Sequence, residues 1–389
     1  MALQSQPRIL IVGAGAIGIM LGYHLSLAGA DLTYLVRPHH AERLSHPQIL
    51  YSYQGVTSIE FKGYNFITDP AQIGTSDYDY LLVTPDAATL MAPQGAALVK
   101  TIGEIFKGRH AKILLAGTFH NFKSWFAEAS GLPENRLACI IVPIAIHETK
   151  VELKTHGYVD KEQFHKADYA FARLNPDITL QIEDEPKFAD FVSLYNTCGV
   201  GHCITSPAAQ MAAHLLPIFS LLVPMELLGW PSMKDLDRNS ELWRLGTAAV
   251  KELRGLSLYG EAGRQAADAT NEDSLVKDFS SMEQTALPLD QADFNRYHHG
   301  GKVSKQDQDH VRVCVEYAIA DGRPLTAAPE LLRRLEEKHG SSAYEDSLVV
   351  THPTTNSPAC GLSTAERTGS PVLHTLWSYV LICLPEQKM

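Results

Sequence analysis

The chain has 389 residues, which is enough for two domains that each bury a hydrophobic core. Its hydrophobic content of 45% and charged content of 20% are typical of a soluble globular protein. The net charge of −11, with no basic stripe to offset it, argues against a nucleic-acid partner. The six cysteines lack the spacing of a zinc site or a disulfide framework. We therefore expect a cytoplasmic protein that acts on a small molecule, with no metal and no membrane partner.

The most informative segment is residues 8–18, which read Arg-Ile-Leu-Ile-Val-Gly-Ala-Gly-Ala-Ile-Gly. A strand of buried character leads directly into Gly-x-Gly-x-x-Gly, and a helical pattern and a second strand (residues 31–36) follow. This order predicts a dinucleotide-binding βαβ unit. Gly13 allows the tight turn, Gly15 lets a pyrophosphate approach the backbone, and Gly18 lets the helix pack on the strand. The expected cofactor contacts in this loop are Gly13, Ala14, Gly15, Ala16, Ile17 and Gly18.

The end of the second strand indicates which dinucleotide is bound. An acidic residue there would bind the ribose 2′-hydroxyl of NAD, but residues 36–40 read Val-Arg-Pro-His-His. Arg37 could instead pair with a 2′-phosphate through charge-assisted hydrogen bonds, with His39 or His40 nearby. An ordinary solvated arginine at a strand end is the alternative. The sequence therefore favours NADP(H) over NAD(H).

Strand and helix patterns alternate after the first unit. A β excursion is predicted at residues 50–67, and strands are predicted at 78–84, 112–116, 137–146 and 178–182, of which the last is expected to close the sheet. This alternation is typical of an α/β fold with a doubly wound sheet. From about residue 206 the patterns become helical, at residues 208–228, 241–259, 273–283, 305–320 and 328–338. We predict a Rossmann domain over 1–205, an all-helical substrate or dimerisation domain over 206–345, and a poorly ordered extension over 346–389.

The glycine-rich unit, the arginine after the second strand and the helical second domain together resemble the ketopantoate reductase (2-dehydropantoate 2-reductase) family, over roughly residues 8–338. Residues 279–282, Phe-Ser-Ser-Met, fall where that family has a Ser-Met pair at a helix start. Residues 294–303 are similar to an insertion in divergent fungal-type members. The resemblance implies a 6-phosphogluconate-dehydrogenase-like fold and reduction of an α-keto acid by NADPH. It also implies a catalytic Lys and Glu in the helical domain and an Asn after a Rossmann strand.

The sequence departs from the family pattern at these positions. The strand at 113–115 leads to Ala-Gly-Thr-Phe instead of Asn-Gly, and the helix predicted at 208–228 has no lysine. Gln306 stands where the glutamate is expected, and Pro85-Asp86 replaces a lysine that contacts the cofactor. Loss of the lysine removes the proton donor. A general acid typically increases the reaction rate by about 10²–10⁴-fold. Ketopantoate is therefore not the expected substrate.

The segment 298–302 is the densest remaining cluster of proton donors. His298, His299 and Lys302 flank Gly300-Gly301, between the helix that carries Ser281 and the next helix. Histidine titrates near neutral pH and burial can lower the pKa of a lysine, so both residue types suit acid catalysis. The alternative is an exposed or structural turn.

Other polar residues complete the candidate site. His120 and Asn121 follow a Rossmann strand and could hold nicotinamide or substrate, although Asn121 could equally cap the next helix. His214 lies in an apolar helix and is either a substrate contact or a histidine of the hydrophobic core. Ser281 could hold a polar group of the substrate or merely begin its helix, and Asp86 is interpreted as a solvated or capping residue. The remaining expected cofactor contacts are Thr84, Pro85 and Thr118.

These observations favour an NADPH-dependent oxidoreductase that reduces a carbonyl or imine other than ketopantoate, with secondary metabolism as one setting. Two alternatives stay open. The first is an enzyme that keeps the fold and the nucleotide but performs a non-redox cyclisation or isomerisation. The second is a nucleotide-sensing regulatory protein. The sequence also leaves a homodimer open.

Overall fold

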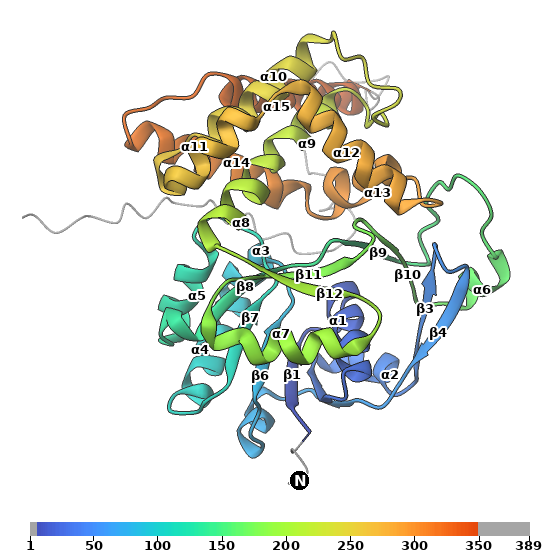
Figure 1. Ribbon diagram of the computed structural model, residues 1–389. Helices are drawn as coiled ribbons and strands as arrows, with labels where there is room; N and C mark the ends of the chain where they lie inside the picture. Colours follow the sequence, from blue (N-terminus) through green and yellow to red (C-terminus); the bar gives the residue numbers. More distant parts are fainter. Residues whose placement is uncertain (1–5, 349–389) are drawn as a thin grey trace, which may run out of the picture. The chain divides into compact units, whose positions relative to one another are not determined.

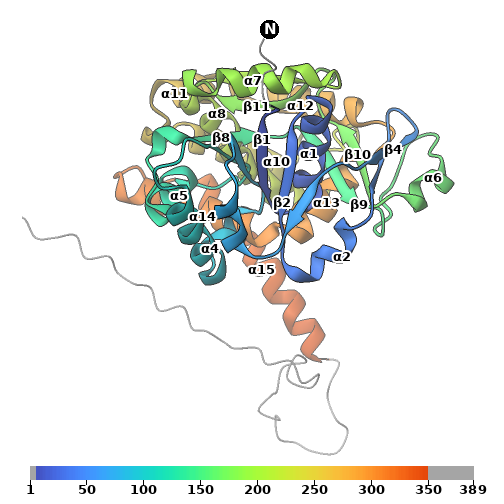
Figure 2. The same cartoon turned by 90° about the horizontal axis from the view of Figure 1, so that it is seen from below.

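The sequence Ile-Leu-Ile-Val places apolar side chains on both faces of β1 (Arg8–Val12), the central strand in the computed structural model of residues 6–348. Ile9 and Ile11 belong to one hydrophobic core, and Leu10 and Val12 belong to another. Because successive side chains of a strand point to opposite faces, both faces of the sheet must be covered. Helices α1 (Ala16–Leu27) and α7 (Ala189–Tyr195) cover one face. Helices α4 (Pro93–Phe106) and α5 (Phe122–Ser130) cover the other (Figure 2).

The main sheet has eight strands in the order β12-β11-β8-β7-β6-β1-β2-β5. Its strands are β1, β2 (Asp31–Leu35), β5 (Asn65–Ile67), β6 (Tyr80–Val83), β7 (Lys112–Leu115), β8 (Leu137–Ile141), β11 (Ile178–Glu183) and β12 (His202–Ser206). The pairs from β5 to β8 are parallel, whereas β11 runs antiparallel to β8. The strand order reverses at β1, so the predicted doubly wound Rossmann sheet is confirmed.

Two strand predictions were wrong in detail. The run at 137–146 forms two strands, because Pro143 lacks the N–H that a continuous ladder needs, and β9 (Ile144–Glu148) enters a separate sheet. The segment at 178–182 does not close the main sheet, since β12 lies outside it at the edge. The β excursion predicted at 50–67 contains three strands, which belong to two sheets.

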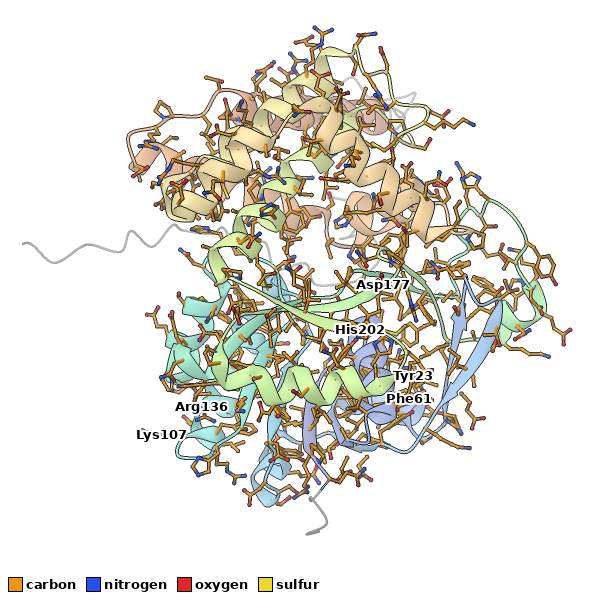
Figure 3. All side chains as sticks on the ribbon, viewed as in Figure 1. Tyr23, Phe61, Lys107, Arg136, Asp177 and His202 are labelled. Atoms are coloured by element: carbon orange, nitrogen blue, oxygen red, sulfur yellow. The ribbon has the colours of Figure 1, made fainter. Side chains whose placement is uncertain are left out.

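The second sheet has the order β4-β3-β10-β9 and lies beside the Rossmann domain (Figure 1). It is formed by β3 (Gln48–Ser52), β4 (Thr57–Phe61), β9 and β10 (Tyr169–Arg173), and α6 (Lys161–Lys166) lies in the loop between the last two. Tyr23 of α1 packs edge-to-face on Phe61 of β4, with ring centroids 6.1 Å apart; both are labelled in Figure 3. A separate core joins this sheet to Ala286, Leu289 and Phe294 of the helical region.

The second half of the described chain is helical, as predicted. Its helices are α8 (Ala208–Leu215), α9 (Phe219–Leu227), α10 (Glu241–Arg254), α11 (Gly260–Ala269), α12 (Glu272–Ala286), α13 (Gln291–Tyr297), α14 (Ser304–Ala320) and α15 (Ala327–Leu348). The single helix predicted at 208–228 is interrupted by a 3₁₀ turn at Leu216–Ile218, which contains Pro217. Helices α11 and α13 were not predicted. In the described part of the chain, Ala208–Leu227 alone is long and apolar enough to span a membrane, and more than half of it is buried in the protein.

The predicted boundary at 205–206 lies where β12 ends and the helical region begins. Residues up to Lys338 form one compact unit that contains both the Rossmann and the helical regions. The predicted extension over 346–389 lies almost entirely outside the described residues.

Candidate active site

The glycine-rich loop has the geometry that the sequence predicts for each glycine. Gly13 has φ +91°, a left-handed conformation that side chains rarely adopt, and a Cβ there would lie 2.9 Å from Thr84 Oγ1. A Cβ on Gly18 would lie 2.2 Å from the carbonyl oxygen of Gly13, so only glycine lets α1 pack this closely. Gly15 is exposed, and a Cβ there would meet no heavy atom within 4 Å. The backbone at Gly15 is therefore open to an approaching ligand.

The N-terminus of α1 is free to receive an anion. Its N-cap residue is Gly15, no side chain caps the first turn, and that turn contains no acidic residue. The unpaired N–H groups and the positive end of the helix dipole therefore face the open space above Gly15. This arrangement fits the pyrophosphate of a dinucleotide.

The loop after β6 supports the glycine turn. The hydroxyl of Thr84 donates to the carbonyl oxygens of Val12 (2.8 Å) and Gly13 (3.2 Å). Asp86 caps α3 (Ala87–Met91) by accepting a hydrogen bond from the backbone N–H of Thr89 at 2.7 Å. The capping interpretation of Asp86 is confirmed, and the contact of Thr84 with the turn is a structural one.

The end of β2 carries positive charge without an acidic partner. Arg37 is exposed, and among the residues whose side chains are described it makes no ion pair; its Nη2 lies 3.4 Å from Nε2 of His40. The rings of His39 and His40 lie 4.1 Å apart. Burial, followed by the positive neighbours His39, Arg43 and Arg37, lowers the pKa of His40. Glu148 acts on His40 in the opposite direction, so the charge that this cluster offers to a 2′-phosphate is chiefly that of Arg37.

Arg43 joins the glycine-rich loop to the second sheet, and sequence analysis missed it. Its Nη2 donates to the carbonyl oxygen of Ala14 at 2.5 Å, and Nη1 lies 3.9 Å from Glu148 of β9. The guanidinium lies 5.7 Å from the ring of Tyr169, whose hydroxyl donates to the same Ala14 oxygen at 3.3 Å. Nε of Arg43 is buried without a partner. No motif marks this arginine, because its contacts come from three separate parts of the chain.

The predicted 298–302 cluster forms a π-helical turn between α13 and α14. His298 stacks on Phe294 with ring centroids 5.4 Å apart, and burial together with the positive neighbours His299 and Lys302 lowers its pKa to about 3. His298 is therefore neutral near pH 7 and cannot supply a proton as an imidazolium. Lys302 is exposed, and the ring of Tyr297, which immediately precedes the turn, lies 6.4 Å from that of His147 in β9.

His299 has a specific acidic partner, Asp307, in the first turn of α14. Nδ1 of His299 lies 2.7 Å from Oδ2 of Asp307, and the two side chains are only 21% and 6% exposed. Burial raises the pKa of Asp307, and the neighbouring His299 partly offsets that effect. Sequence analysis missed Asp307; a carboxylate eight residues after a histidine becomes a partner only through the π-helical turn.

Helix α14 contacts the loops at the carboxyl ends of β6 and β7. Oε1 of Gln306 accepts a hydrogen bond from the backbone N–H of Ala88 at 3.1 Å. Nδ1 of His310 accepts one from the backbone N–H of His120 at 3.2 Å, and burial lowers the pKa of His310 to about 3. These contacts place the start of α14 over the sheet edge where ligands bind in such folds.

The four predicted substrate contacts lie in different surroundings, and for three of them the structural alternative was wrong. His120 is buried, its ring 5.8 Å from that of Tyr317, and burial lowers its pKa. Asn121 occupies the N-cap position of α5 with φ 55°, but its side chain makes no capping hydrogen bond, so the capping interpretation was wrong. His214 is exposed, so it is not a core histidine. Ser281 is exposed and does not begin a helix, because α12 begins at Glu272.

Two cavities lie away from the glycine-rich loop. One, of about 310 Å³, is lined by Arg109, His110, Lys112, Asn135, Arg136 and Lys187. The other, of about 210 Å³, lies beside Trp230 and is lined by residues that include His156, Asp290 and Arg296. In the first cavity the guanidinium of Arg136 is already bound to the carbonyl oxygens of Phe106 and Ala111. Neither cavity includes a predicted site residue.

Comparison with known proteins adds a family profile that matches part of the chain. The family profile described as "Ketopantoate reductase PanE/ApbA" matches residues 9–115, which run from β1 to β7. The chain matches no curated protein sequence.

Solved structures match over most of the chain. The 2-dehydropantoate 2-reductase from Geobacter metallireducens GS-15 has a TM-score of 0.56 and 16% identity, over 85% of this chain and 99% of that one. The enzyme from Methylococcus capsulatus has a TM-score of 0.59 and 12% identity, over 90% and 100%. D-Mandelate dehydrogenase, solved with NADH, has a TM-score of 0.54 and 10% identity, over 86% and 99%. The chain thus has the ketopantoate reductase fold, and its segment 9–115 carries the sequence pattern of the PanE/ApbA ketopantoate reductase family.

Proposed function

We propose that this protein is an NADPH-dependent oxidoreductase that reduces a carbonyl or imine group of a small molecule other than ketopantoate. The observation that carries the proposal is the glycine-rich loop. Gly15 is open above a helix N-terminus that has no side-chain cap and no acidic residue, while Gly13 and Gly18 fit no larger residue. The ketopantoate reductase fold supports the same class of reaction.

The preference for NADPH rests on the end of β2. Arg37 has no carboxylate partner among the described side chains, and His39 and His40 stand beside it. The 2′-phosphate of NADPH would give Arg37 a negatively charged hydrogen-bond acceptor, whereas the 2′-hydroxyl of NADH is uncharged. A similar fold has been solved with NADH, so the identity of the dinucleotide depends on these residues and not on the fold.

When bound, the nicotinamide supplies a hydride to the substrate. This chain must then supply a proton to the developing oxyanion or amine and a surface that keeps water out. The candidates in the π-helical turn are His299 and Lys302, since His298 is neutral against Phe294. Arg43 and Tyr169 hold the loop itself, through the carbonyl oxygen of Ala14.

Two features argue against ketopantoate as the substrate. Helices α8 and α9 contain no lysine. Gln306, which stands where the resemblance implies a glutamate, is buried, and its side-chain oxygen already accepts the hydrogen bond from Ala88. As a reductase, this protein would therefore use another proton donor and another substrate. We place it in the cytoplasm, with secondary metabolism as one setting.

A non-redox enzyme is the second candidate, favoured by the same absence of the family's lysine and glutamate. Such an enzyme would bind the nucleotide but form product without consuming it. Incubation with NADPH and a panel of α-keto acids, aldehydes and cyclic imines separates the two candidates. Loss of NADPH absorbance that depends on a panel member supports the reductase; product formed at constant NADPH supports the alternative.

Arg37→Ala is expected to weaken NADPH binding by about 1.5–3 kcal/mol while leaving NADH binding nearly unchanged, because the guanidinium bonds to a charged group are lost. Isothermal titration calorimetry with both dinucleotides measures the effect. Lys62→Ala, which removes an exposed cation paired with Glu60, is the matched control and should change neither affinity. Equal losses for NADPH and NADH would show that Arg37 does not contact the 2′-phosphate.

The preference for NADPH over NADH is expected to increase as the pH falls from about 8 to about 6. Burial and positive neighbours lower the pKa of His40 in the free protein, so it is neutral at neutral pH. A bound 2′-phosphate favours the protonated form, and lower pH therefore favours the complex with NADPH. Calorimetry with both dinucleotides across this pH range measures the preference. In the His40→Gln control the preference should depend less on pH. A preference independent of pH would place His40 away from the phosphate.

A further inference from the structure

The contact between His299 and Asp307 is the feature of this site that the family resemblance does not imply. We propose that His299 donates the proton in the reduction and that Asp307 is the positioning residue that orients it. This inference rests on the proposed reductase function and adds the identity of its acid. It also assigns a role to Asp307.

His299 differs from its two neighbours in the π-helical turn. The ring of His298 lies against Phe294, at an interplanar angle of 13°, and is neutral. Lys302 is exposed. His299 alone of the three has a buried carboxylate as a direct partner, at 2.7 Å. A histidine held this way has one nitrogen fixed and the other left for chemistry.

The hydrogen bond to Asp307 distinguishes the roles of the two ring nitrogens of His299. Asp307 accepts the Nδ1–H of His299, so the carboxylate fixes the tautomer and the orientation of the ring. Nε2 is then the nitrogen that can give up a proton. In the reduction the substrate carbon gains a hydride, the electron pair of the C=O or C=N double bond moves to the heteroatom, and that atom takes the Nε2 proton. The neutral imidazole regains a proton from water.

The position of Asp307 supports this role. The preceding residue, Gln306, bonds to the backbone of Ala88 beyond β6, and His310, one turn later, bonds to the backbone of His120 beyond β7. Asp307 is 6% exposed, so its carboxylate is held away from water and oriented by the helix. Asp307 therefore lies on the helix segment that contacts the ligand-binding edge of the Rossmann sheet, and His299 is bonded to that segment through Asp307.

A purely structural ion pair is the alternative, and the same helix offers a matched control. Asp309 pairs with Lys305 at 2.6 Å and with Arg312 at 2.8 Å, and its side chain is 38% exposed. Asp309→Asn therefore removes an acidic partner from α14 without touching His299. It should leave catalysis and cofactor binding unchanged.

The first measurement needs neither cofactor nor substrate. In ¹⁵N NMR spectra of the resting protein, His299, assigned by its loss in His299→Gln, is expected to keep a proton on Nδ1 whether or not Nε2 is also protonated. Asp307→Leu, which removes the acceptor, should shift it toward the Nε2–H tautomer, whereas Asp309→Asn should not. A ring already protonated on Nε2 alone in the unmodified protein, or one unaffected by Asp307→Leu, would overturn the positioning role.

The second measurement uses the member of the carbonyl and imine panel that the protein reduces fastest with NADPH. Asp307→Asn and His299→Gln are each expected to lower kcat by at least about 10²-fold, with KM and NADPH affinity unchanged. Full activity in His299→Gln would overturn the proposal while leaving the reductase function standing. Absence of turnover in the unmodified protein across the panel would overturn the proposed function and, with it, the catalytic role of His299.

Discussion

Gly15→Val is expected to abolish NADPH binding, with at least about a 100-fold loss of affinity, while the protein stays folded. The branched side chain would fill the space above α1 that a pyrophosphate needs. The fold should tolerate it because a Cβ at this position meets no heavy atom within 4 Å, and Gly15 does not have a positive φ. Calorimetry with NADPH and thermal unfolding of the same sample measure both effects.

Two other glycines serve as controls for this prediction. Gly74→Val places the same side chain on an exposed turn where the nearest atom, Nη2 of Arg109, is 3.9 Å from the Cβ, and it should change neither property. Gly18→Val would place a Cβ 2.2 Å from the carbonyl oxygen of Gly13 and should destabilise the protein itself. Undiminished NADPH affinity in folded Gly15→Val would mean that this loop does not bind the dinucleotide.

The free energy of unfolding is expected to fall by several kcal/mol between about pH 7 and about pH 5, because three buried histidines stay neutral in the folded protein. Burial is the main cause in each case, and it lowers the pKa of His24 to about 4 and those of His298 and His310 to about 3. The unfolded chain binds protons at these histidines below about pH 6.5, whereas the folded protein does not. The stability is therefore present above that pH and is lost as the pH falls.

Each histidine should contribute roughly 1.5–2 kcal/mol over this range. The raised pKa values of Asp307 and Glu283 work in the opposite direction, because those carboxyl groups take up protons in the folded state. Urea unfolding at a series of pH values gives the number of protons bound on unfolding. His24→Gln should reduce that number by about one. A free energy of unfolding that does not change between these pH values would show that the buried histidines are not neutral.

The N-terminal half of the fold was predictable because its signals are local. The strand, the glycine spacing and the helix that follows occupy one continuous stretch, and Gly18 meets its steric requirement within that stretch, against the carbonyl oxygen of Gly13. The second sheet was not predictable in the same way. Its strands β3 and β10 are separated by more than a hundred residues, and the break at Pro143 sends β9 into a different sheet from β8.

The candidate site was predictable only in part, for a similar reason. The sequence identifies His299, because two histidines and a lysine flank a pair of glycines there, but it does not identify Asp307, whose role depends on a π-helical turn. Arg43 bonds to Ala14 from 29 residues away in the sequence, with no motif to mark it. Ser281 was predicted as a substrate contact from the family resemblance, and His214 from its position in an apolar helix. Both side chains are exposed.

Transfer of deuterium from NADPH labelled at C4 of the nicotinamide tests most directly whether this protein is a reductase of something other than ketopantoate. The labelled cofactor is incubated with the unmodified protein, ketopantoate and the panel of α-keto acids, aldehydes and cyclic imines, and the products are analysed by mass spectrometry. We expect one deuterium in the product of at least one panel member and negligible label in pantoate. Efficient labelling of pantoate, or products formed without any label, would contradict the proposed function.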